Sequence, residues 1–159
     1  MNGLFLDNLG NRLKLEDVVK NIRLFIVLKP LAEYQIIVGT DSHAANETSF
    51  ITAITIRRMG NGGIYFWTRS QKEKCPTLRD RIYREAIHSI MLAEELRGRL
   101  KDELGDEFFW NDQIHIDVGR NGKARDLVDT VVGMVRGYGY EAVIKPYSFG
   151  ASVVADRHT

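Results

Sequence analysis

Two stretches of the chain place an acid and a histidine two residues apart at the end of an apolar run. The sequence IIVGTDSH carries Asp41 and His43, and the sequence QIHIDVG carries His115 and Asp117. Side chains two residues apart in a strand point to the same face of the sheet, so each pair faces one way. Stability alone explains such pairs poorly, and a functional role is favoured. The alternative is turn chemistry, in which Asp41 only caps the loop.

Hydrophobic periodicity indicates the elements that position these residues. Residues 14–30 are apolar at helical spacing and end at Pro30, which predicts a helix that covers the sheet. The expected strands are residues 36–43, 49–59, 64–68, 113–119 and 139–145, and the other expected helices are residues 77–104, 125–137 and 151–158. Residues 1–13 show no clear period and are expected to form an irregular arm.

The order of these elements predicts an α/β fold with a mixed five-stranded sheet. The first, fourth and fifth strands are expected to be parallel, and the second antiparallel to them. Ligands bind such sheets beyond the carboxyl ends of the parallel strands. If the first and fourth strands are neighbours, Asp41 and Asp117 meet there, with Glu85 and Asp156 on flanking helices. Four carboxylates so close repel one another without a cation, and hard oxygen ligands suit Mg²⁺ or Mn²⁺.

Composition narrows the class of protein. The chain has 159 residues, enough for one domain with a proper core, and is 44% hydrophobic and 27% charged. A net charge of +1 argues against a broadly basic nucleic-acid coat, so a polyanion site would be local. Cys75 is the only cysteine, which excludes an internal disulfide. We see no signal-peptide core and no apolar run near the roughly 20 residues that cross a bilayer, so we expect a cytoplasmic protein without a membrane partner.

Several separated motifs resemble those of the YkuK family of ribonuclease H-like proteins. The motifs are GTDSH at 39–43, LRDRIYREA at 78–86, HIDVG at 115–119, GMVRGYGY at 133–140 and KP at 145–146 through ADR at 155–157. Their order along nearly the whole chain makes the resemblance specific. It implies one ribonuclease H-like domain over residues 1–159, with element order β-β-β-α-β-α-β-α and an extra helix at the amino end.

The resemblance also implies a metal-dependent phosphodiester hydrolase, a nuclease using two cations. Its four acids would be Asp41 on the first strand, Glu85 on the long helix, Asp117 on the fourth strand and Asp156 on the last helix. They would serve as catalytic groups and as ligands of Mg²⁺ or Mn²⁺, with Zn²⁺ the less favoured metal. Asp80 competes with Glu85 for its place, and the alternative for Glu85 is a solvated side chain paired with Arg81 or Arg84.

The two histidines depart from the common ribonuclease H pattern. His43 is a candidate additional ligand for a softer metal. His115 lies about 6.6 Å along the strand from Asp117, which favours packing or an orienting role.

A nucleic-acid partner requires a local basic surface beside the acids. The candidate substrate-binding residues are Lys72, Lys74, Arg79, Arg81 and Arg84, together with Arg69. Stacking by the aromatic run 65–67 is a further expectation, although alternate members of that run belong to the core. A solvated helix face is the plain alternative for the charges.

Two other functions remain open from the residues alone. One is a binding module for nucleic acid or protein that keeps the fold without catalysis. The other is a metallohydrolase in which Asp41, His43, Asp117 and His115 hold a transition metal and act on a small phosphorylated substrate.

Overall fold

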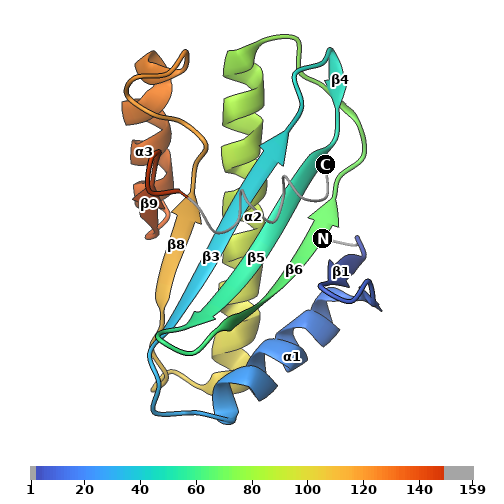
Figure 1. Cartoon of the computed structure of the whole chain (residues 1–159), viewed down its shortest axis with the longest axis vertical. Helices are drawn as coiled ribbons and strands as arrows, with labels where there is room; N and C mark the ends of the chain where they lie inside the picture. Colours follow the sequence, from blue (N-terminus) through green and yellow to red (C-terminus); the bar gives the residue numbers. More distant parts are fainter. Residues whose placement is uncertain (1–2, 149–159) are drawn as a thin grey trace.

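A computed structural model describes residues 3–148, which form a mixed sheet with three helices on one of its faces (Figure 1). The main sheet has seven strands in the order β2-β1-β6-β5-β3-β8-β9, and a separate ribbon pairs β4 with β7. The strands are β1 Phe5–Asp7, β2 Arg12–Leu13, β3 Tyr34–Ser42, β4 Glu47–Thr48, β5 Phe50–Arg58, β6 Gly63–Arg69, β7 Glu73–Lys74, β8 Asn111–His115 and β9 Glu141–Val143. The helices are α1 Leu15–Val27, α2 Leu78–Leu104, the short 3-10 helix η1 Arg125–Leu127 and α3 Val128–Gly137.

The strand directions confirm the expected topology. β3 runs parallel to β8 and antiparallel to β5, and β8 runs parallel to β9. The register of the central pair ends with Gly39 opposite His115, so Asp41 and Asp117 each lie two residues beyond the last paired position. The carboxyl ends of β3 and β8 lie at the same end of the molecule as the amino end of α2, at the top of Figure 1.

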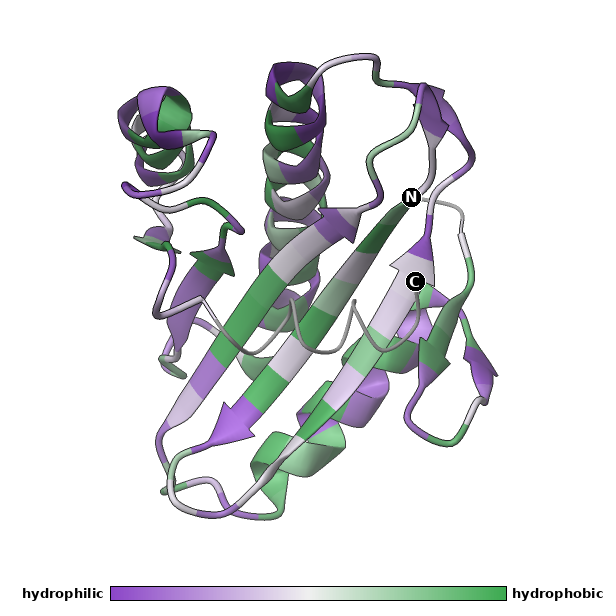
Figure 2. Cartoon of the chain, turned by 45° about the horizontal axis from the view of Figure 1, so that its top comes forward, coloured by the Kyte–Doolittle hydropathy of each residue, from purple (hydrophilic) through white to green (hydrophobic). Residues whose placement is uncertain are grey.

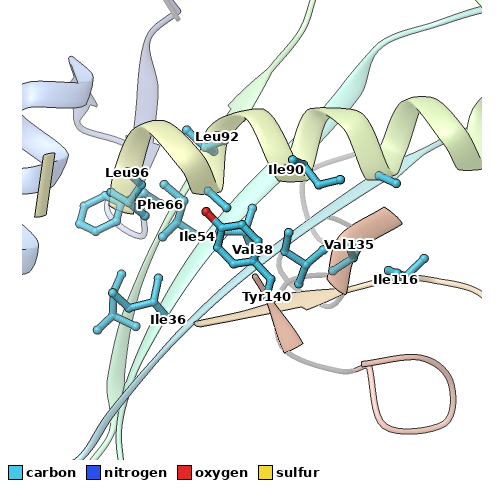
Figure 3. Close-up of a cluster of buried hydrophobic side chains, with 14 of the residues drawn as sticks. Ile36, Val38, Ile54, Phe66, Ile90, Leu92, Leu96, Ile116, Val135 and Tyr140 are labelled. Atoms are coloured by element: carbon cyan, nitrogen blue, oxygen red, sulfur yellow. The ribbon is translucent and has the colours of Figure 1, made fainter. Parts of the chain in front are cut away.

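Alternation along the strands explains where the core sits. Ile36 and Val38 of β3 belong to the large cluster beneath the helices, and both are almost fully buried. Figure 3 shows these side chains against α2 and α3. Ile37, between them, lies on the opposite face and packs with Ala53 and Trp67. The bands of alternating hydropathy along β3 and β5 are visible in Figure 2.

The long helix α2 begins and ends where the sequence predicts. Thr77 is its N-cap and accepts a hydrogen bond from the Asp80 N–H at 3.1 Å, which satisfies one of the free amides of the first turn. Gly105 closes the helix with a φ of 81°, a conformation that favours glycine.

The amino-terminal segment differs from the expectation of an irregular arm. Strands β1 and β2 pair with each other, and β1 pairs with β6 at the edge of the sheet, so the sheet has seven strands and not five. Strands of three and two residues are too short to show a period in the sequence. The fourth expected strand, β8, ends at His115, before Asp117. The expected helix at 151–158, with Asp156, lies outside the described residues.

Candidate active site

A pocket of about 530 Å³ opens at the shared carboxyl end of β3 and β8. Three of the four acids expected from the sequence line it: Asp41, Glu85 and Asp117. They come from a strand, a helix and the segment after a second strand, so the topology alone gathers them. We call this cavity the acidic pocket. Asp156 is the fourth expected acid, and its place is not described.

The end of β3 turns from apolar to polar where it meets α2. Thr40 is buried, and its hydroxyl hydrogen-bonds to Thr52 of β5 at 3.0 Å and to Ser89 of α2 at 2.7 Å. Ser42, two residues further on, donates a hydrogen bond to Glu85 at 2.6 Å. Thr40 and Ser42 therefore face α2, as alternation predicts, and Asp41 between them is half-buried at the pocket.

Glu85 is the buried acid of the acidic pocket. Its residue is only 8% exposed, so the solvated alternative is wrong. Burial raises the pKa of its carboxyl to about 8, and the negative charges of Asp41 and Asp117 add to this, while the Ser42 hydrogen bond and Arg81 oppose it. Near neutral pH, Glu85 is therefore mostly protonated when nothing else neutralises the cluster.

Asp117 is held beyond the end of β8 by backbone contacts with the segment after β9. The Ile116 N–H donates to the Val143 carbonyl at 2.9 Å, and the Lys145 N–H donates to the Val118 carbonyl at 2.8 Å. These bonds place the Lys145 ammonium 2.9 Å from Asp117 Oδ1.

Gly119 makes room for the same lysine. A Cβ at this position would lie 3.1 Å from the Lys145 Cβ, which is closer than most such contacts. Because Gly119 has no side chain, the aliphatic part of the Lys145 side chain can pack against its backbone.

The basic residues at the acidic pocket differ from most of those proposed from the sequence. Four cationic side chains of the described residues line it: Arg81, Arg120, Lys123 and Lys145. Of the sequence candidates only Arg81 is among them; Lys72, Lys74, Arg79 and Arg84 are exposed elsewhere. Arg84 bonds to Glu73 at 2.7 Å instead.

The three cations that sequence reasoning missed lie in two connections, after β8 and after β9. Segments without hydrophobic periodicity give no signal for the direction of a side chain, so these residues could be recognised only by their closeness in sequence to Asp117 and to the KP motif.

Neither histidine near the acids reaches the acidic pocket. His43 is exposed in the connection after β3 and is not a lining residue. His115 is 4% exposed, and burial lowers its pKa to about 4. Its Nε2 hydrogen-bonds to the side-chain oxygen of Gln113 at 3.0 Å. A neutral, buried imidazole of this kind fits the packing role expected for it.

Among the described residues, the acidic side chains that line the acidic pocket are three carboxylates, which are oxygen ligands suited to a hard cation. A cation bound beside Glu85 would favour the ionised form of this carboxyl and so oppose the rise of its pKa. Between residues 3 and 148, no three Asp, Glu, His or Cys side chains are arranged closely enough to hold one ion. The described residues thus supply suitable ligands without a complete coordination shell.

The mixed sheet, its strand order and the acids at its carboxyl end define a ribonuclease H-like protein. The sequence model of the family described as Ribonuclease H-like matches residues 17–159, and the chain belongs to this family. It is also 31% identical over 160 residues to YkuK of Bacillus subtilis (strain 168), described as an uncharacterized protein, with 91% of this chain and 90% of YkuK covered. No solved structure matches the chain. Within the described residues, no helix is both long and apolar enough to cross a membrane.

Proposed function

We propose that this protein is a metal-dependent nuclease that hydrolyses phosphodiester bonds of nucleic acid. The observation that carries the proposal is the meeting of Asp41, Glu85 and Asp117 in one pocket at the carboxyl ends of two parallel strands. Membership of the ribonuclease H-like family supports the proposal, because this family has a nuclease-type fold. The fold alone does not establish an activity, so the proposal depends on the acids of the pocket.

Asp41, Asp117 and Glu85 are the proposed ligands of Mg²⁺ or Mn²⁺, with Asp156 as a fourth. At a carboxylate site of this kind, the bound metal supplies activation of water and stabilisation of the leaving oxygen. The chain's own cations supply the remaining charge: Arg81, Lys123 and Lys145 line the same pocket and offer donors to the phosphate oxygens. Ser42 fixes the carboxyl of Glu85 through its hydrogen bond.

Cleavage of labelled single-stranded DNA, RNA and RNA–DNA hybrid tests the proposal. We expect Mn²⁺- or Mg²⁺-dependent cleavage by the parent and a loss of about a hundredfold or more in Asp41→Asn and Asp117→Asn, because each removes a charge that the reaction uses. Asp126→Asn is the matched control, since Asp126 is exposed and does not line the acidic pocket. Thermal melting of each variant checks its folding.

The same experiment separates the alternatives. Cleavage that survives in both variants contradicts the proposal. Oligonucleotide or protein binding without any cleavage by the parent identifies a binding module. Stoichiometric Zn²⁺ with turnover of small phosphate esters and no attack on nucleic acid identifies the other metallohydrolase.

A further inference from the structure

A second pocket adjoins the acidic pocket and is not used by the proposed reaction. It measures about 440 Å³, within the range of small-molecule sites. Its walls are the connection after β3, at Ala44–Asn46, and the connection before α2, at Cys75–Thr77. Leu78, Arg81 and Lys123 line both cavities, so the two lie side by side. We call this second cavity the loop pocket.

The loop pocket is a built feature, because a β-ribbon holds its two walls. Strands β4 and β7 pair with Glu47 opposite Lys74 and Thr48 opposite Glu73. The Cys75 N–H then donates to the Asn46 carbonyl at 2.8 Å, which extends the contact up to the pocket. The two connections are thereby fixed relative to each other and to the first turn of α2.

The walls of the loop pocket combine apolar side chains with the polar Asn46 and Thr77, and its border with the acidic pocket is basic. Ala44, Ala45, Pro76 and Leu78 give surfaces suited to a flat ring, and Arg81 and Lys123 stand where the cavities meet. Among residues 3–148, no carboxylate lines the loop pocket. The charge of Arg81 acts on both cavities, because it opposes the burial that raises the pKa of Glu85 and of Cys75.

We propose that the two pockets form one groove for single-stranded nucleic acid, in which the nucleotide next to the scissile phosphate places its base in the loop pocket. This inference rests on the proposed function and specifies its substrate. The phosphate between the two nucleotides lies against Arg81 and Lys123, at the junction. A base can enter the loop pocket only when it is unpaired and unstacked, which a single strand allows and a continuous duplex does not.

Filling the loop pocket with a bulky side chain tests the inference without any need for catalysis. We expect Ala45→Trp to weaken binding of a fluorescein-labelled ten-nucleotide single strand by roughly tenfold in EDTA, measured by anisotropy, because contacts of one base are lost. Ala45 is exposed in a connection, so the indole does not enter the core. The matched control is Asn61→Trp, in the turn between β5 and β6, where we expect unchanged affinity.

A second measurement uses the unaltered chain, so that a folding defect of the variant cannot decide the result. A single strand containing 4-thiouridine is cross-linked by light, and the modified peptides are mapped. We expect adducts within residues 44–46 or 75–78. Adducts only at other sites, or equal affinity in Ala45→Trp and the parent, overturn the inference.

The outcomes also separate this inference from the proposed function. Binding that depends on position 45, in a protein that cleaves nothing with Mn²⁺ or Mg²⁺, contradicts the nuclease and retains the groove. Metal-dependent cleavage by a protein whose binding of the single strand is unchanged by Ala45→Trp supports the nuclease and contradicts the groove.

Discussion

Lys145 brings a positive charge to one of the proposed metal ligands. Its ammonium lies 2.9 Å from Asp117 Oδ1, and its side chain is 56% exposed, so it can leave the carboxylate without unfolding the segment. The backbone bond from Lys145 to Val118 holds the stem of the lysine in place whether or not the ion pair forms. A divalent cation bound at Asp117, as proposed, would therefore compete with this ammonium for the same oxygen.

Removing that competitor should tighten metal binding. We expect Lys145→Met to bind Mn²⁺ about two- to fivefold more tightly than the parent, the scale of an exposed ion pair. Isothermal titration at fixed pH and salt gives the affinities. Lys123→Met removes a charge from the same pocket without touching the ion pair of Asp117, so the excess effect at Lys145 measures the competition. Equal or weaker binding in Lys145→Met shows that the lysine does not compete.

Glu85 should make the metal-free protein less stable as pH rises. Its folded pKa of about 8 exceeds the usual glutamate pKa of 4.5, so between these values the folded state binds more protons than the unfolded state. The free energy of unfolding therefore falls as pH increases through this window. Glu85→Gln removes the titration and keeps an oxygen that accepts the Ser42 hydrogen bond.

Urea unfolding in EDTA at pH 5 and pH 9 checks this expectation. Relative to the parent, Glu85→Gln should gain roughly 2–5 kcal/mol between the two pH values, following the size of the shift. The exposed Glu107→Gln should show no such gain. A parent and a Glu85→Gln variant with the same pH dependence would show that Glu85 is ionised at neutral pH.

At the scale of elements, a row of hydroxyls fixes α2 against the sheet. Thr40 of β3 contacts Thr52 of β5 and Ser89 of α2, next to the Ser42–Glu85 bond on the same two elements. Glu85 and Ser89 are one helical turn apart on α2, and Thr40 and Ser42 are two residues apart on the same face of β3. The Thr40–Ser89 and Ser42–Glu85 hydrogen bonds therefore align the helix with the strand at two successive positions. This register sets the depth at which Glu85 enters the acidic pocket.

Breaking the register at Thr40 should destabilise the fold. We expect Thr40→Val to lower the free energy of unfolding by about 1–3 kcal/mol, because Thr52 and Ser89 lose a buried partner. Thr55→Val is an apt control on the neighbouring strand: its buried hydroxyl makes no hydrogen bond within the described residues, so its loss should be neutral or stabilising. Equal costs in the two variants would mean that packing, and not hydrogen bonding, decides. Urea melts at one pH give both values.

The same elements show how far the sequence predicts the site. The adjacency of Asp41 and Asp117 follows from topology, because parallel β3 and β8 have little freedom in a sheet of this order. Glu85 is predictable in part, since it lies beside the apolar stripe of α2, but its burial and its hydrogen bond with Ser42 emerge only from the structure. Three of the cations that line the acidic pocket, Arg120, Lys123 and Lys145, were missed because irregular connections carry them.

The pairing of the shortest strands is also not predictable from the sequence. Strands β1, β2, β4 and β7 each have two or three residues, too few for alternation to be recognised. Yet the β4–β7 pair shapes the loop pocket, and β1 extends the sheet. The parts of the site that depend on side-chain neighbours across short ribbons therefore require the structure.

At the scale of the whole molecule, the net charge of +1 hides a concentration of cations around the acidic pocket. Two basic surfaces are candidates for contacting the phosphates of nucleic acid. One is the pair Arg81 and Lys123 at the junction of the two pockets, and the other is the exposed pair Lys72 and Lys74, close to Glu73 on β7. Their positions, and not their number, should decide which one contacts nucleic acid.

Salt dependence distinguishes the two surfaces. Each phosphate contact to a single strand adds about −0.7 to the slope of log affinity against log salt concentration. We expect the double variant Arg81→Gln, Lys123→Gln to reduce that slope by roughly 0.7 for a ten-nucleotide single strand in EDTA, because both side chains contact the same phosphate. The double variant Lys72→Gln, Lys74→Gln lowers the net charge from +1 to −1 in the same way, since each removes two positive charges. Its slope should match that of the parent, because these side chains stand outside the groove. An equal fall in slope for the two double variants would show that the overall charge of the molecule attracts the nucleic acid. A fall only in Lys72→Gln, Lys74→Gln would place the binding surface at β7 and the start of α2, as the sequence alone predicts.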